Sequence, residues 1–368
     1  VINSKFISTE GEIRKFSNTP IQPVKKDDVT LVMSDVPNGR AIAKSFLVDS
    51  NDRYTLNQRI CALRVNPNEF YPRYLFLQLN RNPDLLAYDD GVKQTNLRKD
   101  EVLKCRIITP DRKEQQQIAD TIFDIDFLIT SLEKLIQKKK MIKQGVMQEL
   151  LTGKRRLPGF DGDWGVDLMP NKCWYQEGPG VRTSQFTRKG VKLFNGSNIH
   201  KNKIDLDNTD RFISEKEAFG MYAHFLADQG DIVIASSGIT IEKFDEKVAY
   251  IEGNHLPLCM NTSTIRFKPK EDKIEKQFIF YFLQSKSFKK QIGGQATGSA
   301  QLNFGPSHID TVTIDFPNDI EEQRSIGMIL KDIDDEIRLY EKKLSKLKSL
   351  KQGAMQQLLT GKIRLINK

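Results

Sequence analysis

The strongest constraint on this sequence is an internal duplication. The run "KQGVMQELLTGK" at residues 143–154 returns as "KQGAMQQLLTGK" at residues 351–362, so that residue i matches residue i + 208. At this offset, and without gaps, residues 114–157 match residues 322–365 at about half of their positions. A match of this length predicts two copies of one structural unit in a single chain.

The duplication extends upstream with lower similarity, and there Gln94 pairs with Gln301. The second copy has residues 155–206 ahead of the counterpart of Val1, whereas the first copy begins at that counterpart. We therefore expect a first unit that is shortened at its N-terminus. A first residue other than methionine is typical of a fragment or of a processed chain.

The most similar part of each copy has the pattern of a long helix. Apolar residues recur at alternating spacings of four and three, which keeps one stripe in line along a helix. The stripe contains Ile118, Ile122, Ile125, Ile129, Leu132 and Ile136 in the first copy, and Ile326, Leu330, Ile333, Ile337, Tyr340, Leu344, Leu347, Ala354 and Leu358 in the second.

Each helix needs a partner that covers this stripe. We expect the two helices to pack together as an intramolecular antiparallel coiled coil, and the alternative is that each helix packs on its own globular portion. Gly145 and Gly353 lie inside the helices at equivalent positions. Because glycine is unfavourable inside a helix, we expect a close helix approach at these two positions.

The remaining sequence mixes strand-like runs such as "DIVIASS" and "TVTIDF" with short helical runs such as "RYLFLQLN". This mixture predicts an α+β fold in which two α/β domains alternate with the two long helices as a tandem, pseudo-two-fold repeat. The expected boundaries are 1–113 and 155–320 for the domains, and 114–154 and 321–368 for the helical regions.

The composition bounds the class of protein. A net charge of +9 favours a polyanionic partner, because lysine and arginine displace counterions from phosphates. The sequence contains no apolar run of the roughly 18 residues that a membrane span needs, and its start has no secretory pattern, so we expect a cytoplasmic protein. Four scattered cysteines and four scattered histidines show no metal-ligand spacing, so no metal site is predicted.

Two variable units, each followed by a helix that opens with a proline, three or four further residues and then E-Q, and that closes L-L-T-G-K, resemble the specificity subunit of type I restriction-modification systems. The first set of these residues is Pro110, Glu114-Gln115 and Leu150–Lys154, and the second set begins with Pro317 and Glu322-Gln323. The segment "GVKLFNGSNI" at residues 190–199 is also similar to an early target-recognition segment of that family.

The resemblance implies that each globular unit is a target recognition domain for one half of a bipartite DNA sequence, and that the paired helices set the distance between the halves. It also implies that the helices dock two adenine-N6 methyltransferase (M) subunits, and that motor and nuclease (R) subunits join the complex. S-adenosylmethionine, ATP and Mg are then expected on those partner subunits, with no cofactor in this chain. Residues expected for partner binding and helix pairing are Ile118, Ile122, Ile125, Ile129, Gly145, Met147, Leu150, Ile326, Leu330, Ile333, Ile337, Gly353, Met355 and Leu358.

Polar loop residues are the candidates for reading DNA, because asparagine and glutamine bind adenine, and arginine and lysine bind guanine or phosphate. The candidates in the second domain are Lys192, Asn195, Ser197, Asn198, Ser236, Ser237, Ser299, Gln301 and Asn303. Those in the first domain are Ser34, Arg40, Lys93, Gln94, Asn96 and Arg98. Asparagines at such places also form turns or caps without any ligand.

Two other functions compete with the specificity subunit. A single-chain enzyme that methylates or cuts DNA would be expected to carry an N-P-P-Y type motif, which this sequence lacks. The run "GGQATGS" at residues 293–299 also lacks the lysine of a phosphate-binding loop, so no catalytic residue is predicted. A coiled-coil adaptor that only assembles proteins would not need the basic charge and the polar loops.

Overall fold

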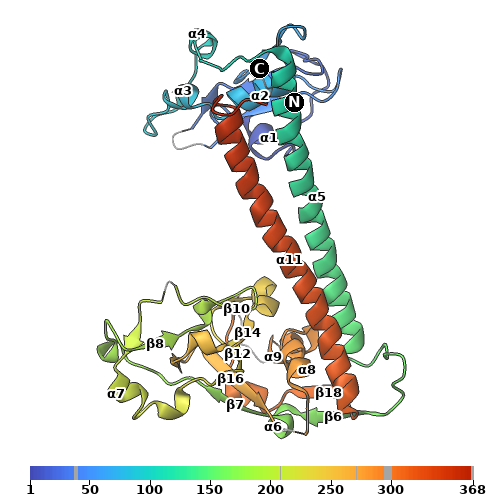
Figure 1. Ribbon diagram of the computed structural model, residues 1–368, viewed down its shortest axis with the longest axis vertical. Helices are drawn as coiled ribbons and strands as arrows, with labels where there is room; N and C mark the ends of the chain where they lie inside the picture. The colour runs from blue at the N-terminus through green and yellow to red at the C-terminus, as the bar shows by residue number, and fades with distance from the viewer. Residues whose placement is uncertain (37–39, 208, 271, 294–300, 366–368) are drawn as a thin grey trace. The chain divides into compact units, whose positions relative to one another are not determined.

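The computed structural model describes residues 1–36, 40–207, 209–270, 272–293 and 301–365, and the chain divides into two compact units (Figure 1). Unit 1 contains Val1–Leu135 and Tyr340–Lys368, and unit 2 contains Ile136–Leu339. Each unit combines a globular portion with the first part of one long helix and the last part of the other.

The globular portion of unit 1 is built on an antiparallel sheet in the order β3-β1-β4. The central strand is buried along its whole length, because apolar clusters cover both of its faces. The elements are α1 (Ser4–Ser8), β1 (Val29–Val32), β2 (Ser34–Asp35), β3 (Ser45–Leu47), β4 (Ile60–Leu63), α2 (Pro72–Leu79), α3 (Pro83–Leu86), β5 (Thr95–Asn96) and α4 (Lys99–Leu103).

The globular portion of unit 2 has a related sheet in the order β14-β12-β16-β7, and a mixed sheet in the order β11-β8-β15. Its strands are β6 (Trp164–Leu168), β7 (Cys173–Glu177), β8 (Val191–Phe194), β9 (Ile199–His200), β10 (Lys203–Ile204), β11 (Phe212–Ile213), β12 (Ile232–Ala235), β13 (Ile239–Thr240), β14 (Val248–Tyr250), β15 (Leu258–Met260), β16 (Thr264–Pro269), β17 (Gln301–Leu302) and β18 (Thr313–Pro317). Its helices are α6 (Met169–Lys172), α7 (Glu215–Ala218), α8 (Lys276–Phe282), α9 (Lys286–Gly293) and α10 (Pro306–Ile309), with 3-10 turns η1 (Thr183–Gln185), η2 (Gly196–Asn198), η3 (Ala223–Phe225), η4 (Ile241–Glu246) and η5 (Gly253–His255).

The duplicated segments form the two long helices, α5 (Arg112–Leu150) and α11 (Ile320–Leu358), which lie side by side (Figure 1). In unit 1, Lys351 near the end of α11 binds Asp126 near the start of α5. In unit 2, Lys143 near the end of α5 binds Asp334 near the start of α11. The helices are therefore antiparallel, and the predicted intramolecular pair in an α+β fold is confirmed.

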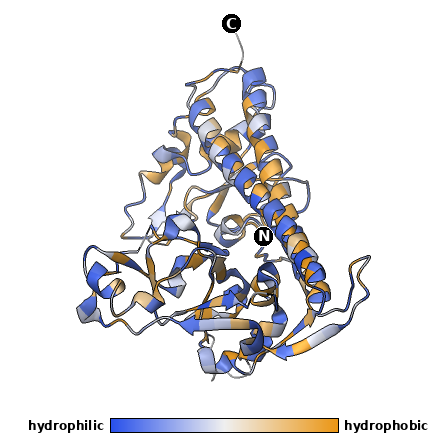
Figure 2. Ribbon diagram, turned by 60° about the horizontal axis from the view of Figure 1, so that its bottom comes forward, coloured by the Kyte–Doolittle hydropathy of each residue, from blue (hydrophilic) through white to orange (hydrophobic). Residues whose placement is uncertain are grey.

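The apolar stripe of unit 1 serves both the helix pair and the globular portion. Ile118 and Ile122 of α5 form one buried cluster with Leu358 of α11 and with Tyr74 and Leu77 of α2. Both alternatives considered for this stripe therefore apply, because the side chains contact the opposite helix and their own domain. Polar and apolar residues are interspersed along the whole length of both long helices, as Figure 2 shows.

The stripe of unit 2 joins a larger core. Met147 and Leu150 of α5 and Ile326 and Leu330 of α11 belong to the same buried cluster as the sheet residue Ile234. Of the other residues expected for partner binding and helix pairing, Ile125, Ile129 and Ile337 are buried, and Ile333 and Met355 are half-buried. The ends of both helices are thus fixed to the domain of the unit to which they belong.

The expected close approach at Gly145 and Gly353 is wrong for contacts within the described chain. Both glycines are exposed, and a Cβ atom at either position would meet no heavy atom within 4 Å. The close approach lies at Gly327 of α11, where a Cβ atom would be 2.7 Å from Cβ of Gln277 in α8. The duplication places Ala119 at the matching position of α5, so both copies keep a small residue where a short helix crosses.

A buried carboxylate at the first turn of each long helix binds an arginine that follows the other helix. Arg364 donates Nε to Oε1 (2.8 Å) and Nη2 to Oε2 (2.5 Å) of Glu114 in unit 1. Arg156 makes the same bidentate pair with Glu322 in unit 2, at 2.8 and 2.7 Å. We call these two pairs the clasps, and each joins the start of one helix to the exit from the other.

The glutamine beside each clasp fixes the short helix that crosses the pair. Gln115 donates Nε2 to the Pro110 carbonyl (2.9 Å) and accepts a bond from the backbone amide of Tyr71 (2.8 Å), just before α2. Gln323 repeats both bonds with the Pro317 carbonyl (2.8 Å) and the backbone amide that precedes α8 (2.7 Å). The proline and the E-Q pair that open each long helix therefore form a structural joint.

The packing of the stripe predicts a large difference between two alanine variants of α5. Ile122→Ala should lower the free energy of unfolding by about 2–5 kcal/mol, because truncation of a fully buried side chain leaves a cavity. Leu128→Ala, where the side chain is 51% exposed, should change it by less than about 0.5 kcal/mol. Chemical denaturation measures both values, and equal stabilities would contradict this packing.

The unit 1 clasp predicts a specific acid sensitivity. The hydrogen bonds from Arg364 hold the pKa of Glu114 below its ordinary value of 4.5. A carboxylate with a lowered folded-state pKa stabilises the fold fully above its unfolded-state pKa, and this contribution is lost as the pH falls through the folded-state value. Glu114→Gln should therefore lower the thermal midpoint at pH 7 and flatten its decline below pH 4.5. Glu133→Gln, which removes an exposed carboxylate of α5, should follow the wild-type curve.

Candidate nucleic-acid interface

In unit 1 the structure brings together two of the predicted loop segments. Strands β2 and β5 pair so that Ser34 lies opposite Asn96. Gln94 donates Nε2 to Oγ of Ser34 (2.9 Å) and to Oδ1 of Asn96 (3.2 Å). The side chains of Gln94 and Asn96 are exposed beside this pairing, together with the exposed cation of Lys93.

Unit 2 repeats this arrangement with strands β13 and β17, in which Thr240 lies opposite Gln301. Asn303 accepts hydrogen bonds at Oδ1 from Oγ of Ser237 (2.9 Å) and from the backbone amide of Gly238 (2.9 Å). Gln301, Asn303 and Ser237 are exposed. Ser299, the remaining candidate of this loop, lies outside the described residues.

Three of the candidate residues are buried and cannot present a side chain to DNA. Ser34 lies under Gln94, and the Ser236 hydroxyl donates to the Thr262 carbonyl (3.4 Å). Asn198 donates Nδ2 to Oγ1 of Thr209 (2.7 Å) from a buried position. The burial of these three side chains argues against their direct contact with DNA, because each is part of the support beneath an exposed loop.

The "KLFNGSN" segment is mainly a folded scaffold. The Asn198 side chain accepts the amide of Asn195 (2.9 Å), which caps η2, and Lys192 donates Nζ to the Leu206 carbonyl (3.0 Å). Ser197 is the exposed side chain of η2. Here the asparagines form the turn that was considered as the alternative to DNA contact.

Lys247 supports the same segment, and the sequence analysis did not identify it. Its Nζ donates to the carbonyl oxygens of Ile199 (2.5 Å) and Gly196 (3.4 Å). Burial, aided by the neighbouring Lys243, lowers the pKa of Lys247. Only its place directly before the buried strand β14 could have marked it as a structural lysine.

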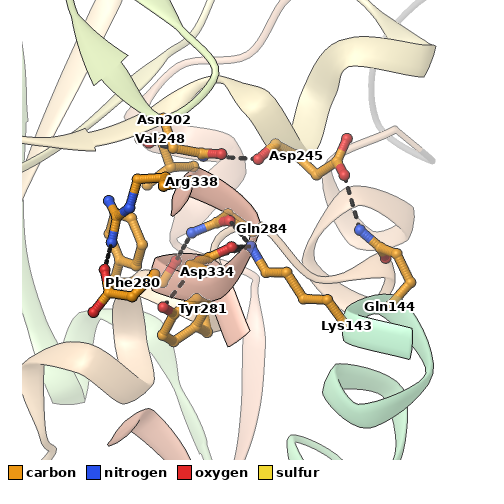
Figure 3. A network of polar contacts seen from close by, with 11 residues as sticks. Lys143, Gln144, Asn202, Asp245, Val248, Phe280, Tyr281, Gln284, Asp334 and Arg338 are labelled. Carbon is orange, nitrogen blue, oxygen red and sulfur yellow. Dashed lines mark hydrogen bonds and ion pairs between the residues drawn. The ribbon is translucent and has the colours of Figure 1, made fainter. Parts of the chain in front are cut away.

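A buried polar network fixes the globular portion of unit 2 to both long helices (Figure 3). Lys143 of α5 places Nζ 2.7 Å from Oδ1 of Asp334 in α11 and 3.2 Å from Oε1 of Gln284. Tyr281 of α8 donates its hydroxyl to Asp334 (3.0 Å). Removing one member of a buried ion pair costs about 3–5 kcal/mol, because the other charge stays buried without a partner.

A second branch of this network reaches the loop region of the domain. Gln144 donates Nε2 to Oδ2 of Asp245 in η4 (2.8 Å). Asn202 donates Nδ2 to the carbonyls of Asp245 (2.8 Å) and Val248 (2.9 Å) (Figure 3). The helix pair is therefore linked through η4 to the neighbourhood of β13, whose loop carries the candidate Ser237.

The exposed candidates of unit 1 are more basic than those of unit 2. Arg40, Lys93 and Arg98 are all exposed, and Arg98 has Glu101 4.0 Å away. Side chains of this kind hold phosphates or bind guanine, while the exposed amides of both units suit adenine. The arrangement offers hydrogen-bond donors and acceptors on a fixed support.

The described residues also bear on metal binding, membrane spans and the state of the cysteines. Among them no group of three or more histidine, cysteine, aspartate or glutamate residues has the geometry of a metal site. Within these residues no helix is both long enough and apolar enough to cross a membrane. Cys61, Cys105, Cys173 and Cys259 are free, and burial raises the pKa of Cys61 and Cys259 to about 11.

Comparison with known proteins gives a consistent result. The family described as "Type I restriction modification DNA specificity domain" matches residues 1–144 and 173–349. The MjaVIII specificity subunit of Methanocaldococcus jannaschii is 29% identical over 304 residues, which cover 80% of this chain and 71% of that protein. A putative MjaX specificity subunit of the same organism is 24% identical over 376 residues, covering 94% and 83%.

Solved structures share the fold. The S subunit of a type I restriction-modification system from M. genitalium has a TM-score of 0.58 at 17% identity, covering 95% of this chain and 87% of that one. A chain from a study of complex assembly and conformational transition in a type I system has a TM-score of 0.54 at 16% identity, covering 93% and 84%. Because the family match spans most of the sequence, the chain belongs to the type I restriction modification DNA specificity family, as the non-catalytic DNA specificity subunit of such a system.

Proposed function

We propose that this subunit reads a bipartite DNA sequence, with one half read by each unit. The observation that carries the proposal is the repetition of one support in both units, where β2 pairs with β5 and β13 pairs with β17. Each pairing exposes a glutamine and an asparagine at equivalent places of the duplication. In this proposal residues 1–113 and 155–320 are the target recognition domains, and residues 114–154 and 321–368 are the helical regions that set the gap.

The reading groups are the exposed members of the candidate set. Gln94 and Asn96 in unit 1, and Gln301 and Asn303 in unit 2, supply amides that suit adenine edges in the major groove. Arg40, Lys93 and Arg98 add phosphate or guanine contacts to unit 1 alone. Because the two exposed sets differ, we expect the two half-sites to differ in sequence.

Partner docking falls on the exposed faces of the helices. Met147 and Leu150 are buried in the core of unit 2, so they support the fold and are not available to a partner. Ile142 and Leu350 are exposed at matching positions of the duplication, beside the open positions Gly145 and Gly353. Two equivalent surfaces suit two equivalent M subunits, since repeated partners need repeated contacts.

The chemistry of the complex is assigned to the partners. In this proposal the M subunits hold S-adenosylmethionine, and the R subunits hold ATP and Mg. The specificity subunit supplies double-stranded DNA recognition and the spacing of the two M subunits. A reconstituted complex that methylates no defined motif would argue against this division of roles.

The experiment that tests the proposal is a long-read map of N6-methyladenine in the host with and without this gene. Loss of one asymmetric bipartite motif on deletion is the expected result. Loss of a palindromic motif would mean that one type of unit reads DNA and that two chains act together. An unchanged methylome would contradict DNA reading by this subunit in the host.

Single substitutions should separate the two half-sites. Gln94→Ala should relax or abolish base choice in one half-site only, and Gln301→Ala should do so in the other. A lost bidentate contact costs about 1–3 kcal/mol of discrimination against the wrong base. Methylation of a randomised DNA library by the reconstituted complex measures both effects. Leu128→Ala, an exposed change on α5, is the control, and an unaltered motif in both glutamine variants would show that the reading loops are misassigned.

A further inference from the structure

The two cross-helix lysine pairs are related by the duplication and have one register. Lys143 binds Asp334 in unit 2, and Lys351 binds Asp126 in unit 1. In an antiparallel pair, residues that face each other have residue numbers with a constant sum, and this sum is 477 for both lysine–aspartate pairs. The antiparallel helices therefore have the same alignment in both units.

We propose that these two pairs act as pins that select this register, and that they thereby fix the gap between half-sites that the complex accepts. The inference rests on the proposed function, in which the helix pair sets that gap. The apolar stripe alone is a weak determinant of register, because isoleucine and leucine recur along both helices and stay in contact after a shift of one turn.

The Lys143 pin excludes shifts by one turn. Sliding α11 by three or four residues in either direction would replace Asp334 by Leu330, Lys331, Ile337 or Arg338. None of these side chains accepts a hydrogen bond from an ammonium group, and two of them repel it. A lysine held between two helices and α8 would then have no counter-charge (Figure 3).

The second pin excludes shifts by two turns. A slide of seven residues in one direction offers Glu341 to Lys143, but it places Leu358 opposite Asp126. The slide in the other direction places Gly327 opposite Lys143 and Leu344 opposite Asp126. Among shifts of one or two turns, only the observed register satisfies both pins. Polar residues at a helix seam select one alignment in the same way in other paired helices.

The consequence for DNA has a definite size. One helical turn advances about 5.4 Å, and a base pair of B-form DNA advances about 3.4 Å. A helix pair that samples a register one turn away would therefore accept gaps that are one or two base pairs longer or shorter. The bases read within each half-site would stay the same, because the pins lie outside the candidate reading loops.

The test uses Lys143→Met combined with Asp334→Asn. This change removes both charges, and asparagine retains an oxygen for the Tyr281 hydroxyl. Reconstituted complexes methylate a DNA library in which the half-sites are constant and the gap varies, and sequencing reports methylation for each gap. We expect wild type and Lys143→Arg to keep one gap and the double variant to spread to neighbouring gaps. Lys331→Met with Asp335→Asn, an exposed pair within α11, is the control and should keep one gap.

A distance measurement tests the register without DNA. Spin labels at Ser131→Cys and Ser345→Cys, exposed positions of α5 and α11 in unit 1, are introduced with Cys61→Ala and Cys105→Ala. The full chain should show one distance, and the double variant should add a second population. If the double variant does not fold, Lys351→Met with Asp126→Asn takes its place, because that pair is more exposed.

The two readouts separate the possible failures. One label distance and one gap in the variants would overturn the inference. A second distance with no gap-dependent methylation, even in the wild type, would overturn the proposed function and leave the register pins established. Broadened gaps with one label distance would also count against the pins, because the cause would then lie outside the helix register.

Discussion

The structure depends on the two buried carboxylates that join each long helix to the exit from the other. Glu114 and Glu322 are buried hydrogen-bond acceptors. Each makes a bidentate pair with the arginine that follows the other long helix, Arg364 for Glu114 and Arg156 for Glu322. A helix of 39 residues has many places where it could pack on a neighbour. Because the clasp holds this first turn beside the exit from the other helix, the neighbouring glutamine and the short crossing helix meet their partners there.

Much of this fold could be predicted from the sequence, because the duplication and the apolar spacing are properties of the sequence alone. Ile118 and Ile122 follow the helical period, and they are buried as the pattern requires. The pairing of the helices also followed, since a repeated apolar stripe needs a repeated partner. The sharing of that stripe with α2 did not follow, because helix spacing does not identify which of two nearby apolar surfaces covers each turn.

The candidate site was less accessible to prediction. Asn195 and Asn198 match a recognition segment in type and spacing, yet the Asn198 side chain closes the turn of η2, and the Asn195 side chain accepts a hydrogen bond from Asn261. Sequence gives the chemistry of an amide but not its partners, and asparagine binds its own backbone as readily as a base. Gly145 shows the same limit, because a glycine inside a helix marks a close approach only where another element crosses it, as at Gly327.

The duplicated pins show how the two halves diverge while the helices stay alike. Lys143 and Lys351 occupy the same position of the repeat, but the Lys351 pair is more exposed than the Lys143 pair. Tyr71 and Glu275 are equivalent, because each donates its backbone amide to the glutamine beside a clasp. Six residues later α2 has Leu77 and α8 has Tyr281, and only tyrosine has a hydroxyl for the aspartate.

The side chains of the short crossing helix therefore determine how deeply the equivalent lysine–aspartate pair is buried in each unit. In unit 1 the same helix instead donates Nε2 of Gln78 to the Leu359 carbonyl at the end of α11 (2.9 Å). Each crossing helix belongs to its globular domain and also contacts the long helices, through Tyr281 in unit 2 and Gln78 in unit 1. The domain and its crossing helix therefore act as one structural unit on the helix pair. Domains could diverge in the bases they read without disturbing the helices, provided that α2 or α8 diverged with them.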